Sequence, residues 1–298
     1  MNTIKIKLSL IFCSFLLSYS FAVTTNFDLK KKSQDTLVTI MSFNIRNSNA
    51  SDGANNWSNR KKWVGELIHF YKPGIVGLQE VLHSQLQDLL VGLPEYNYIG
   101  VGRNDGKKKG EYSPIFYDTT SYELLQSATF WLSENTTNPS ISWGAATYRI
   151  VTWGQFRDKV TDETFFVFNT HFDNRENARE KSAILLLEKV HQIADKSQAI
   201  ITGDFNSNPK SQAYQILTGS TEKNTGLFDT MKLAKNRYGP DYTFHSFGKV
   251  PVEKRERIDY IFISKAVNVS QFVIISEQRG ELFPSDHMPL IAKINLKN

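Results

Sequence analysis

The chain has 298 residues, of which 40% are hydrophobic and 22% are charged. This apolar share supports a packed core and excludes a disordered chain. The formal net charge is +5, from 35 Lys and Arg against 30 Asp and Glu. Beyond the N-terminus, the sequence contains no apolar run of about 20 residues, the length that spans a bilayer. A multi-pass membrane protein is therefore excluded.

Residues 1–22 have the pattern of a secretory signal peptide. Lys5 and Lys7 precede a short apolar run, and the small residues Ser20 and Ala22 suit a cleavage site. The apolar run is shorter than a spanning helix requires, which disfavours an uncleaved anchor. We expect a secreted or periplasmic protein, whose mature form keeps 33 Lys and Arg against 30 Asp and Glu.

The only cysteine, Cys13, lies inside this N-terminal segment. The mature protein would then have no thiol. That excludes a disulfide framework, a thiolate zinc site and a cysteine nucleophile together.

The pattern of the remaining chain predicts one α/β domain over residues 36–298, preceded by a polar linker over 23–35. Two stacked sheets would allow one core to absorb the many predicted strands. The predicted helices cover 60–71, 84–90 and 175–194. The predicted strands cover 36–44, 75–78, 96–101, 113–117, 148–156, 164–170, 199–202, 257–264 and 289–296.

Polar residues recur where the apolar strands begin or end. Loops at one edge of a strand scaffold commonly build a site. Each residue also has a structural interpretation: Glu80 could favour a helix N-terminus, and Asp204 could cap a turn with Asn206. Their joint placement favours a functional site. The set is Asn44, Glu80, His171, Asp173, Asp204, Asn206, Asp259, Asp286 and His287.

The donor atoms in this set are carboxylate and amide oxygens and imidazole nitrogens. Hard oxygen ligands suit Mg²⁺, Mn²⁺ or Ca²⁺, whereas zinc prefers more nitrogen or sulfur. A hard divalent ion offsets the negative charge that develops in phosphate chemistry, and histidine adds acid–base capacity. The sequence therefore points to phosphoryl chemistry.

At these residues the chain resembles the endonuclease/exonuclease/phosphatase (DNase I-like) superfamily, in its secreted bacterial form. The matching blocks occur in the family's order and span nearly the whole mature chain. The resemblance implies a four-layer α/β sandwich, with two packed mixed β-sheets flanked by helices. The blocks are Ser42-Phe43-Asn44-Ile45-Arg46, Leu78-Gln79-Glu80, Asn169-Thr170-His171-Phe172-Asp173, Gly203-Asp204-Phe205-Asn206-Ser207-Asn208-Pro209, Arg257-Ile258-Asp259-Tyr260-Ile261 and Ser285-Asp286-His287-Met288-Pro289-Leu290.

The resemblance also implies a metal site and a base. Glu80 would be the principal ligand of Mg²⁺ (or Mn²⁺ or Ca²⁺), helped by Asn44 and Asp286. Asp204 would orient or deprotonate the attacking water. Asn206 would hold an oxygen of the substrate phosphate.

The remaining implied roles surround the phosphate. His287 would contact it, oriented by Asp259. His171 would donate to the phosphate or to the leaving oxygen. By the same resemblance, Glu111 would pair with His171. Arg149 would contact the phosphate, the alternative being a surface charge at a strand edge.

The substrate stays open. The first interpretation is a secreted phosphodiesterase or phosphatase acting on a small or glycan-linked ester. The alternatives are a nonspecific endonuclease, a sphingomyelinase-like lipid phosphodiesterase and a catalytically inactive binding module. A mature charge of +3 does not demand nucleic acid, which stays a candidate partner. We expect a monomer with no stable membrane insertion, because no amphipathic segment stands out.

Two segments have open interpretations. The basic run over 103–109 could contact a phosphate backbone or an anionic headgroup, or could be a solvated flexible loop. The aromatic residues of 128–132 and 142–144 could wall a substrate pocket or belong to the core.

Overall fold

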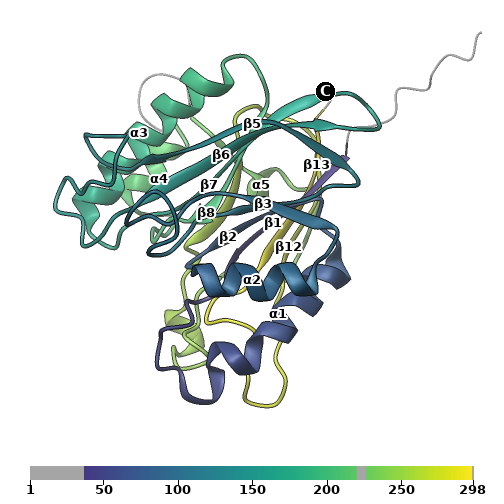
Figure 1. The fold of residues 1–298 in the computed structure, drawn as a ribbon, viewed down its shortest axis with the longest axis vertical. Coiled ribbons are helices and arrows are strands. Elements are labelled where there is room, and N and C mark those ends of the chain that lie inside the picture. The colour runs from purple at the N-terminus through teal and green to yellow at the C-terminus, as the bar shows by residue number, and fades with distance from the viewer. Residues whose placement is uncertain (1–36, 220–225, 297–298) are drawn as a thin grey trace, which may run out of the picture. The chain divides into compact units, whose positions relative to one another are not determined.

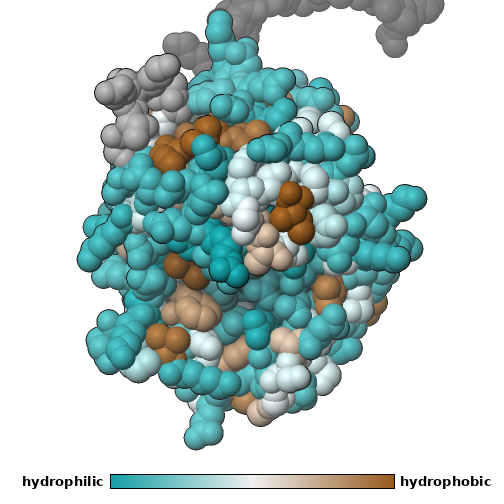
Figure 2. Space-filling view, turned by 90° about the vertical axis from the view of Figure 1, so that its left-hand side faces the viewer, coloured by the Kyte–Doolittle hydropathy of each residue, from teal (hydrophilic) through white to brown (hydrophobic). Residues whose placement is uncertain are grey.

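The computed structural model describes residues 37–219 and 226–296. The expected signal peptide over 1–22 and linker over 23–35 lie outside these ranges. Within the two described ranges, no helix combines the length and apolar character needed to cross a bilayer. Figure 2 shows one face of the domain, on which hydrophilic side chains predominate and hydrophobic ones form small separate groups.

A seven-stranded mixed sheet forms one half of the domain. β1 (Leu37–Asn44) and β2 (Ile75–Gln79) run parallel at its centre, and β2 is buried along its whole length. A parallel pair needs a crossover connection, and α1 (Trp57–Tyr71) supplies it. The other strands of this sheet are β3 (Tyr96–Ile99), β4 (Ile115–Asp118), β10 (Asn236–Tyr238), β12 (Val269–Ile274) and β13 (Leu290–Asn295).

A six-stranded mixed sheet forms the other half, in the order β5-β6-β7-β8-β11-β9. β7 (Thr164–His171) and β8 (Ala199–Asp204) are its parallel pair, connected by α3 (Glu176–Ala194). The remaining neighbours pair antiparallel. They are β5 (Tyr122–Trp131), β6 (Ile150–Asp158), β9 (Phe228–Asp229) and β11 (Asp259–Ile263).

The two sheets pack face to face, with β1 and β2 against β8 and β7. Ile75, Val167 and Ile200 belong to the apolar core between them. α1 and α2 (His83–Gly92) cover the outer face of the seven-stranded sheet, while α3 and α4 (Gln212–Leu217) cover that of the other sheet (Figure 1). The expected four-layer α/β sandwich is therefore confirmed.

The element boundaries differ from the sequence predictions at informative places. α1 begins at Trp57 rather than Arg60, because the Asn56 side chain accepts a hydrogen bond from the Asn59 backbone and caps the helix. The sequence prediction missed β5, an edge strand with a polar centre and a register shift between Leu124 and Gln126. It also missed β9, β10, β12, α4 and the short α5 (Thr230–Leu233).

The structure describes both open segments, and Trp143 of 142–144 is only half-buried. Phe130, Trp131 and Leu132 are buried, so the interpretation of 128–132 as core is correct. The indole nitrogen of Trp131 donates to the backbone oxygen of Arg103 at 2.8 Å. This bond braces the basic segment over 103–109, which forms a hydrogen-bonded hairpin with exposed lysines rather than an irregular loop.

Candidate active site

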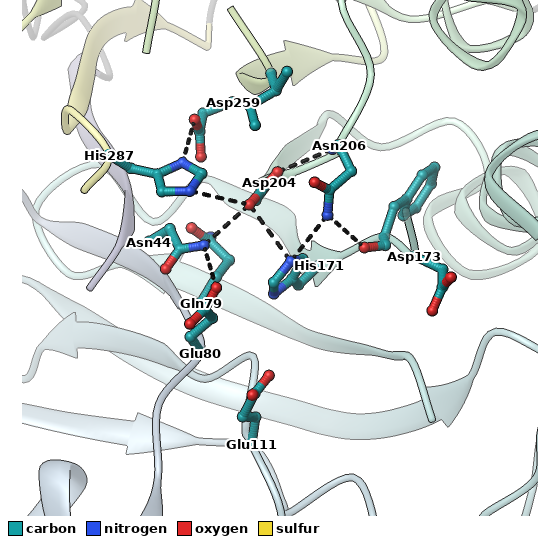
Figure 3. Close-up of polar contacts among 12 residues, drawn as sticks. Asn44, Gln79, Glu80, Glu111, His171, Asp173, Asp204, Asn206, Asp259 and His287 are labelled. Atoms are coloured by element: carbon teal, nitrogen blue, oxygen red, sulfur yellow. Dashed lines mark hydrogen bonds and ion pairs between the residues drawn. The ribbon is translucent and has the colours of Figure 1, made fainter. Parts of the chain in front are cut away.

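The polar residues gather because both parallel strand pairs end at one edge of the sandwich. Asn44 ends β1, Glu80 follows β2, and His171 and Asp204 end the neighbouring strands β7 and β8. Asp259 joins them because β11 runs antiparallel to β8, with Asp259 opposite Asp204 in the register. Figure 3 shows these side chains pointing toward one another from both sheets.

His287 arrives at the same edge on the loop before β13, which pairs antiparallel with β1. Its Nδ1 lies 2.9 Å from an oxygen of Asp259, and its Nε2 lies 3.7 Å from Asp204. Burial alone would lower the pKa of His287, but the Asp259 and Asp204 carboxylates outweigh it and hold the pKa well above its ordinary value. His287 is therefore a charged donor at neutral pH, oriented by Asp259.

Asp204 occupies the centre of the cluster (Figure 3). It accepts hydrogen bonds from the Asn44 amide at 3.0 Å and from the Asn206 backbone at 2.9 Å. Burial, reinforced by the negative charge of Asp259, raises the pKa of Asp204 to about 7. A carboxylate with a pKa near neutrality suits general base catalysis.

His171 contrasts with His287 in its charge. Its Nε2 lies 3.4 Å from Asp204 and 3.1 Å from the Asn206 amide nitrogen. Burial lowers the pKa of His171 well below its ordinary value, and the charges of Arg149 and Arg103 lower it further. The cluster thus combines a neutral imidazole with a charged one, on either side of one carboxylate.

Asn206 is held in place beside these histidines. Its backbone adopts a positive φ of 47°. Its side-chain nitrogen donates to the Phe172 backbone oxygen at 2.9 Å as well as facing His171. Asn206 is one of the residues that line the active-site pocket.

Glu80 lies at the seven-stranded side of the site, also with a positive φ, of 61°. One oxygen accepts from the Asn44 amide at 3.2 Å, and the other accepts from the backbone and side chain of Asn47 at 3.1 and 3.0 Å. Burial would raise the pKa of Glu80, but the charge of His287 and the Asn47 hydrogen bond outweigh it, so the pKa is lowered. Glu80 is ionised at neutral pH.

Asp286 is the second carboxylate on this side. One of its oxygens accepts from the Ser285 hydroxyl at 3.2 Å. Burial raises the pKa of Asp286; the positive charge of His287 opposes this rise, and the negative charge of Glu80 adds to it. Two negatively charged carboxylates that repel each other in a buried site favour the binding of a cation.

The donor set fits a hard divalent cation. Mg²⁺ usually binds one or two carboxylates and keeps several waters, so Glu80 and Asp286 satisfy its chemistry. Asn44 contributes less directly, since its Oδ1 already accepts from the Arg46 backbone at 3.0 Å. Among the described residues, the compact group with metal-ligand atoms is instead Asp204, Asp259 and His287. The hydrogen bond between His287 and Asp259 already occupies two ligand atoms of that group.

The predicted pairing of Glu111 with His171 is wrong in this structure. Glu111 forms an ion pair with Arg103 at 2.6 Å, and its other oxygen accepts from the Asn47 amide at 3.4 Å. Arg103 reaches it because both lie on the same hairpin, where the Arg103 backbone also donates to the Glu111 carbonyl. The Nδ1 of His171, which faces this side, has no hydrogen-bond partner.

Arg149 precedes β6 and is only 8% exposed, so its interpretation as a surface charge is wrong. Its Nε lies 3.3 Å from Asp173, which also accepts from the backbones of Ala146 and Arg175. The Nη1 of Arg149 is buried without a hydrogen-bond partner. Asp173 thus anchors an arginine that retains donor capacity beside the site.

One pocket of about 350 Å³ unites these residues. Sequence reasoning missed six of its lining residues as functional candidates. Arg46 and Ile258 carried a signal, because both lie in family blocks, whereas the other four lie in loops without a recognisable pattern. The six are Arg46, Asn47, Asn174, Phe244, Ser246 and Ile258; the rest are Glu80, Arg103, Glu111, Arg149, His171, Asp204, Asn206, Asp286 and His287.

A buried arginine fixes the relative position of two loops that carry site residues. The Nη1 of Arg60 donates to the Ile45 carbonyl at 2.8 Å and to the Pro284 carbonyl at 2.7 Å. These carbonyls immediately follow Asn44 and closely precede Asp286. The α1 helix therefore ties both sides of the carboxylate pair together.

Two packed mixed sheets flanked by helices, with a polar site where both sheets end, define the DNase I-like class of fold. The chain belongs to the Endonuclease/Exonuclease/phosphatase family, whose model matches residues 41–287. Members of this family are hydrolases that act on phosphate esters.

Solved structures and curated relatives agree with this assignment. An endonuclease/exonuclease/phosphatase from Bacteroides vulgatus is 44% identical, with a TM-score of 0.84 over 88% of this chain and 100% of that one. The mannosyl-6-phosphatase of Bacteroides thetaiotaomicron is 35% identical, with a TM-score of 0.81 over 86% and 99%. Human nocturnin is 26% identical over 289 residues, which cover 85% of this chain and 64% of nocturnin.

Proposed function

We propose that the protein is a secreted, divalent-metal-dependent hydrolase that cleaves phosphate esters by in-line attack of water. The observation that carries this proposal is the pair of histidines flanking Asp204, one charged and one neutral. A charged donor, a neutral donor and a base with a pKa near 7 meet the needs of phosphoryl transfer to water. No covalent intermediate on the protein is required.

Each side chain has a role that follows from its position. Asp204 accepts the proton of the attacking water. His287, kept charged by Asp259, donates to a phosphate oxygen as negative charge builds there. His171 donates to the phosphate or to the leaving oxygen, and Asn206 orients the His171 ring through the contact of its amide nitrogen with Nε2. Arg149, anchored by Asp173, offers its unpartnered Nη1 to the phosphate.

The cation site is assigned to the other side of the pocket. Glu80 and Asp286, with Asn44 beside them, would hold Mg²⁺ (or Mn²⁺ or Ca²⁺), which supplies positive charge to the phosphate oxygens. The supporting observations are the opposing effects of burial and charge on these two carboxylates and their hard oxygen donors.

The substrate that we favour is a phosphorylated sugar. The support is the 35% identity to the mannosyl-6-phosphatase over nearly its whole length. The pocket volume of about 350 Å³ lies within the range of small-molecule sites. A sphingomyelinase-like activity stays a further alternative, which hydrolysis of sphingomyelin would support.

Nucleic acid is the second candidate substrate, and one observation favours it. The hairpin that carries Arg103 into the pocket exposes Lys107, Lys108 and Lys109 beside it. Such a cluster can follow a phosphate backbone, in which case cleavage falls steeply as salt rises.

The test is hydrolysis of an ester panel by the mature chain, starting at Val23, with Mg²⁺ or with EDTA. The panel contains mannose 6-phosphate, glucose 6-phosphate, p-nitrophenyl phosphate, bis-p-nitrophenyl phosphate, plasmid DNA and sphingomyelin. We expect Mg²⁺-dependent turnover that is highest on a sugar phosphate. Preferred cleavage of DNA, with a strong salt dependence, would select the second candidate. No turnover of any ester would contradict the proposal.

Secretion is tested separately. Expression of the full chain in a Gram-negative host should deliver a periplasmic protein whose N-terminal residue is Val23. An intact N-terminus in the cytoplasmic fraction would contradict this part of the proposal.

A further inference from the structure

Arg46 lines the active-site pocket but has no role in the proposed reaction. It follows β1 by two residues and adopts a positive φ of 59°. Its backbone is held on both sides: its N–H donates to Asn44 at 3.0 Å, and its carbonyl accepts from the Gln85 amide at 2.9 Å. A non-glycine residue in this left-handed conformation is strained, and the strain directs the side chain into the pocket.

The Arg46 guanidinium lies among three carboxylates at unequal distances. It pairs with both oxygens of Asp52, at 3.1 and 3.2 Å. It stands 3.8 Å from Asp286 and 4.0 Å from Glu80, beyond hydrogen-bond distance. Arg46 is thus bound to Asp52 and only stands beside the two carboxylates assigned to the cation.

We propose that Asp52 is a positioning residue that tethers Arg46 beside the Glu80–Asp286 pair and so sets the affinity of that pair for a divalent cation. The inference rests on the proposed function, because it uses the assignment of Glu80 and Asp286 as ligands. Arg46 supplies a positive charge that competes with the cation. Asp52 limits this competition, because its two carboxylate oxygens accept hydrogen bonds from Nε and Nη2 of Arg46.

Electrostatics gives the two substitutions opposite signs. Removing the charge of Arg46 takes away one of the two positive side chains that act on Glu80 and Asp286, the other being His287, and so strengthens divalent-cation binding. Removing the charge of Asp52 frees Arg46 to approach the pair, which weakens binding. Since Asp52 is only 10% exposed and Asp286 only 7%, solvent screens these interactions incompletely. We expect changes of about tenfold in the dissociation constant.

A double-mutant cycle distinguishes an effect of Asp52 that acts through Arg46 from a direct effect of the Asp52 charge on the bound cation. If Asp52 acts through Arg46, its substitution matters only while Arg46 is present. If Asp52 acts by its own negative charge on the cation, its substitution weakens binding equally in both backgrounds.

The experiment is calorimetric titration of the folded mature protein with Mn²⁺ and with Mg²⁺, without substrate. The variants are Arg46→Gln, Asp52→Asn and the double substitution, with Arg46→Met as a second charge deletion. Arg279→Gln is the matched control, because Arg279 forms an exposed ion pair with Glu66 instead. We expect Arg46→Gln to lower the dissociation constant about tenfold and Asp52→Asn to raise it several-fold. The double variant should match Arg46→Gln within about twofold.

Two results would overturn the inference: unchanged or weaker cation binding in both Arg46 variants, or an equal effect of Asp52→Asn in both backgrounds. A Glu80→Gln variant distinguishes these failures from failure of the proposed function. If Glu80→Gln leaves cation binding unchanged, the ligand assignment is wrong and the tether is overturned with it. Thermal unfolding in EDTA verifies that each variant is folded before titration.

Discussion

The Nδ1 of His287 lies 2.9 Å from an oxygen of Asp259, while the other ring nitrogen of His287 faces Asp204 at 3.7 Å. This relation joins two segments of the six-stranded sheet to the loop before β13. It gives His287 a raised pKa and a fixed orientation. The charges of these side chains determine how activity should depend on pH and on substitution.

Substitution Asp259→Asn should reduce kcat by about 10²- to 10⁴-fold, as is typical when a catalytic group loses its charge or orientation. Without the Asp259 carboxylate, the pKa of His287 falls, and the ring loses the hydrogen bond that orients it. The measurement is kcat against pH for the best ester of the panel. A variant with wild-type kcat at pH 8 would contradict the role of Asp259.

The pH profile of the wild-type protein should rise with pH through about 7, because Asp204 must lose its proton to act as a base. It should not fall again until well above pH 7, since His287 retains its proton over that range. The measurement is kcat/KM from pH 5 to 10 at saturating Mg²⁺. A profile that falls between pH 6 and 7 would show that His287 is not the charged donor.

Substitution Asp204→Asn should stabilise the protein at alkaline pH while it abolishes turnover. The pKa of Asp204 in the folded state, about 7, exceeds its ordinary value of 3.8. The folded state therefore binds more protons than the unfolded state between these values, so this carboxylate reduces stability as pH rises from about 4 to 7. We expect the variant to unfold a few degrees above the wild-type protein at pH 8 in EDTA, and the difference to shrink towards pH 4. Equal melting temperatures at both pH values would contradict the raised pKa.

Substitution Arg149→Met should raise KM about tenfold with a smaller change in kcat, because Arg149 is assigned to phosphate binding. Arg157→Met is the matched control, since Arg157 lies near the far end of β6 and its side chain is 40% exposed. Steady-state kinetics with the same ester checks both variants. An equal effect of the two substitutions would exclude a specific role for Arg149.

Substitution Glu111→Gln tests whether Glu111 acts through Arg103 rather than through His171. Because Glu111 pairs with Arg103, its neutralisation should alter KM through Arg103 and leave the shape of the pH profile unchanged. A shift of the profile by one pH unit or more would instead show that Glu111 pairs with His171 in the working enzyme.

The sequence allowed much of the fold and the site to be predicted, for a physical reason. Continuous apolar runs such as 75–78 and 199–202 identify strands buried on both faces, and polar residues directly after them must share one edge of the sheets. Asn44, Glu80, His171 and Asp204 were located in this way, and all four gather in the structure. The number of predicted strands indicated two stacked sheets, and the resemblance to the family supplied the four-layer arrangement with flanking helices.

Other features could not be predicted, because they depend on contacts between distant segments. β5 lies at the edge of its sheet and pairs with one neighbour, β6, so its centre can be polar. A polar centre lacks the apolar pattern by which a strand is predicted from sequence. Whether Glu111 pairs with Arg103 or with His171 depends on how the hairpin that carries Arg103 and Glu111 folds. Phe244 lines the pocket, where its ring packs against that of His287 with the ring centres 4.9 Å apart and its backbone pairs with the distant residues Glu256 and His287.

The most direct test of the central claim is phosphate release by His287→Asn and wild-type protein at pH 8 with Mg²⁺. His69→Gln is the matched control, because His69 is exposed and pairs with Glu95 on the surface. The account predicts that kcat/KM falls about 10²- to 10⁴-fold in His287→Asn and stays unchanged in His69→Gln. It also predicts that EDTA abolishes the wild-type activity. Full, EDTA-resistant turnover by His287→Asn would contradict the account.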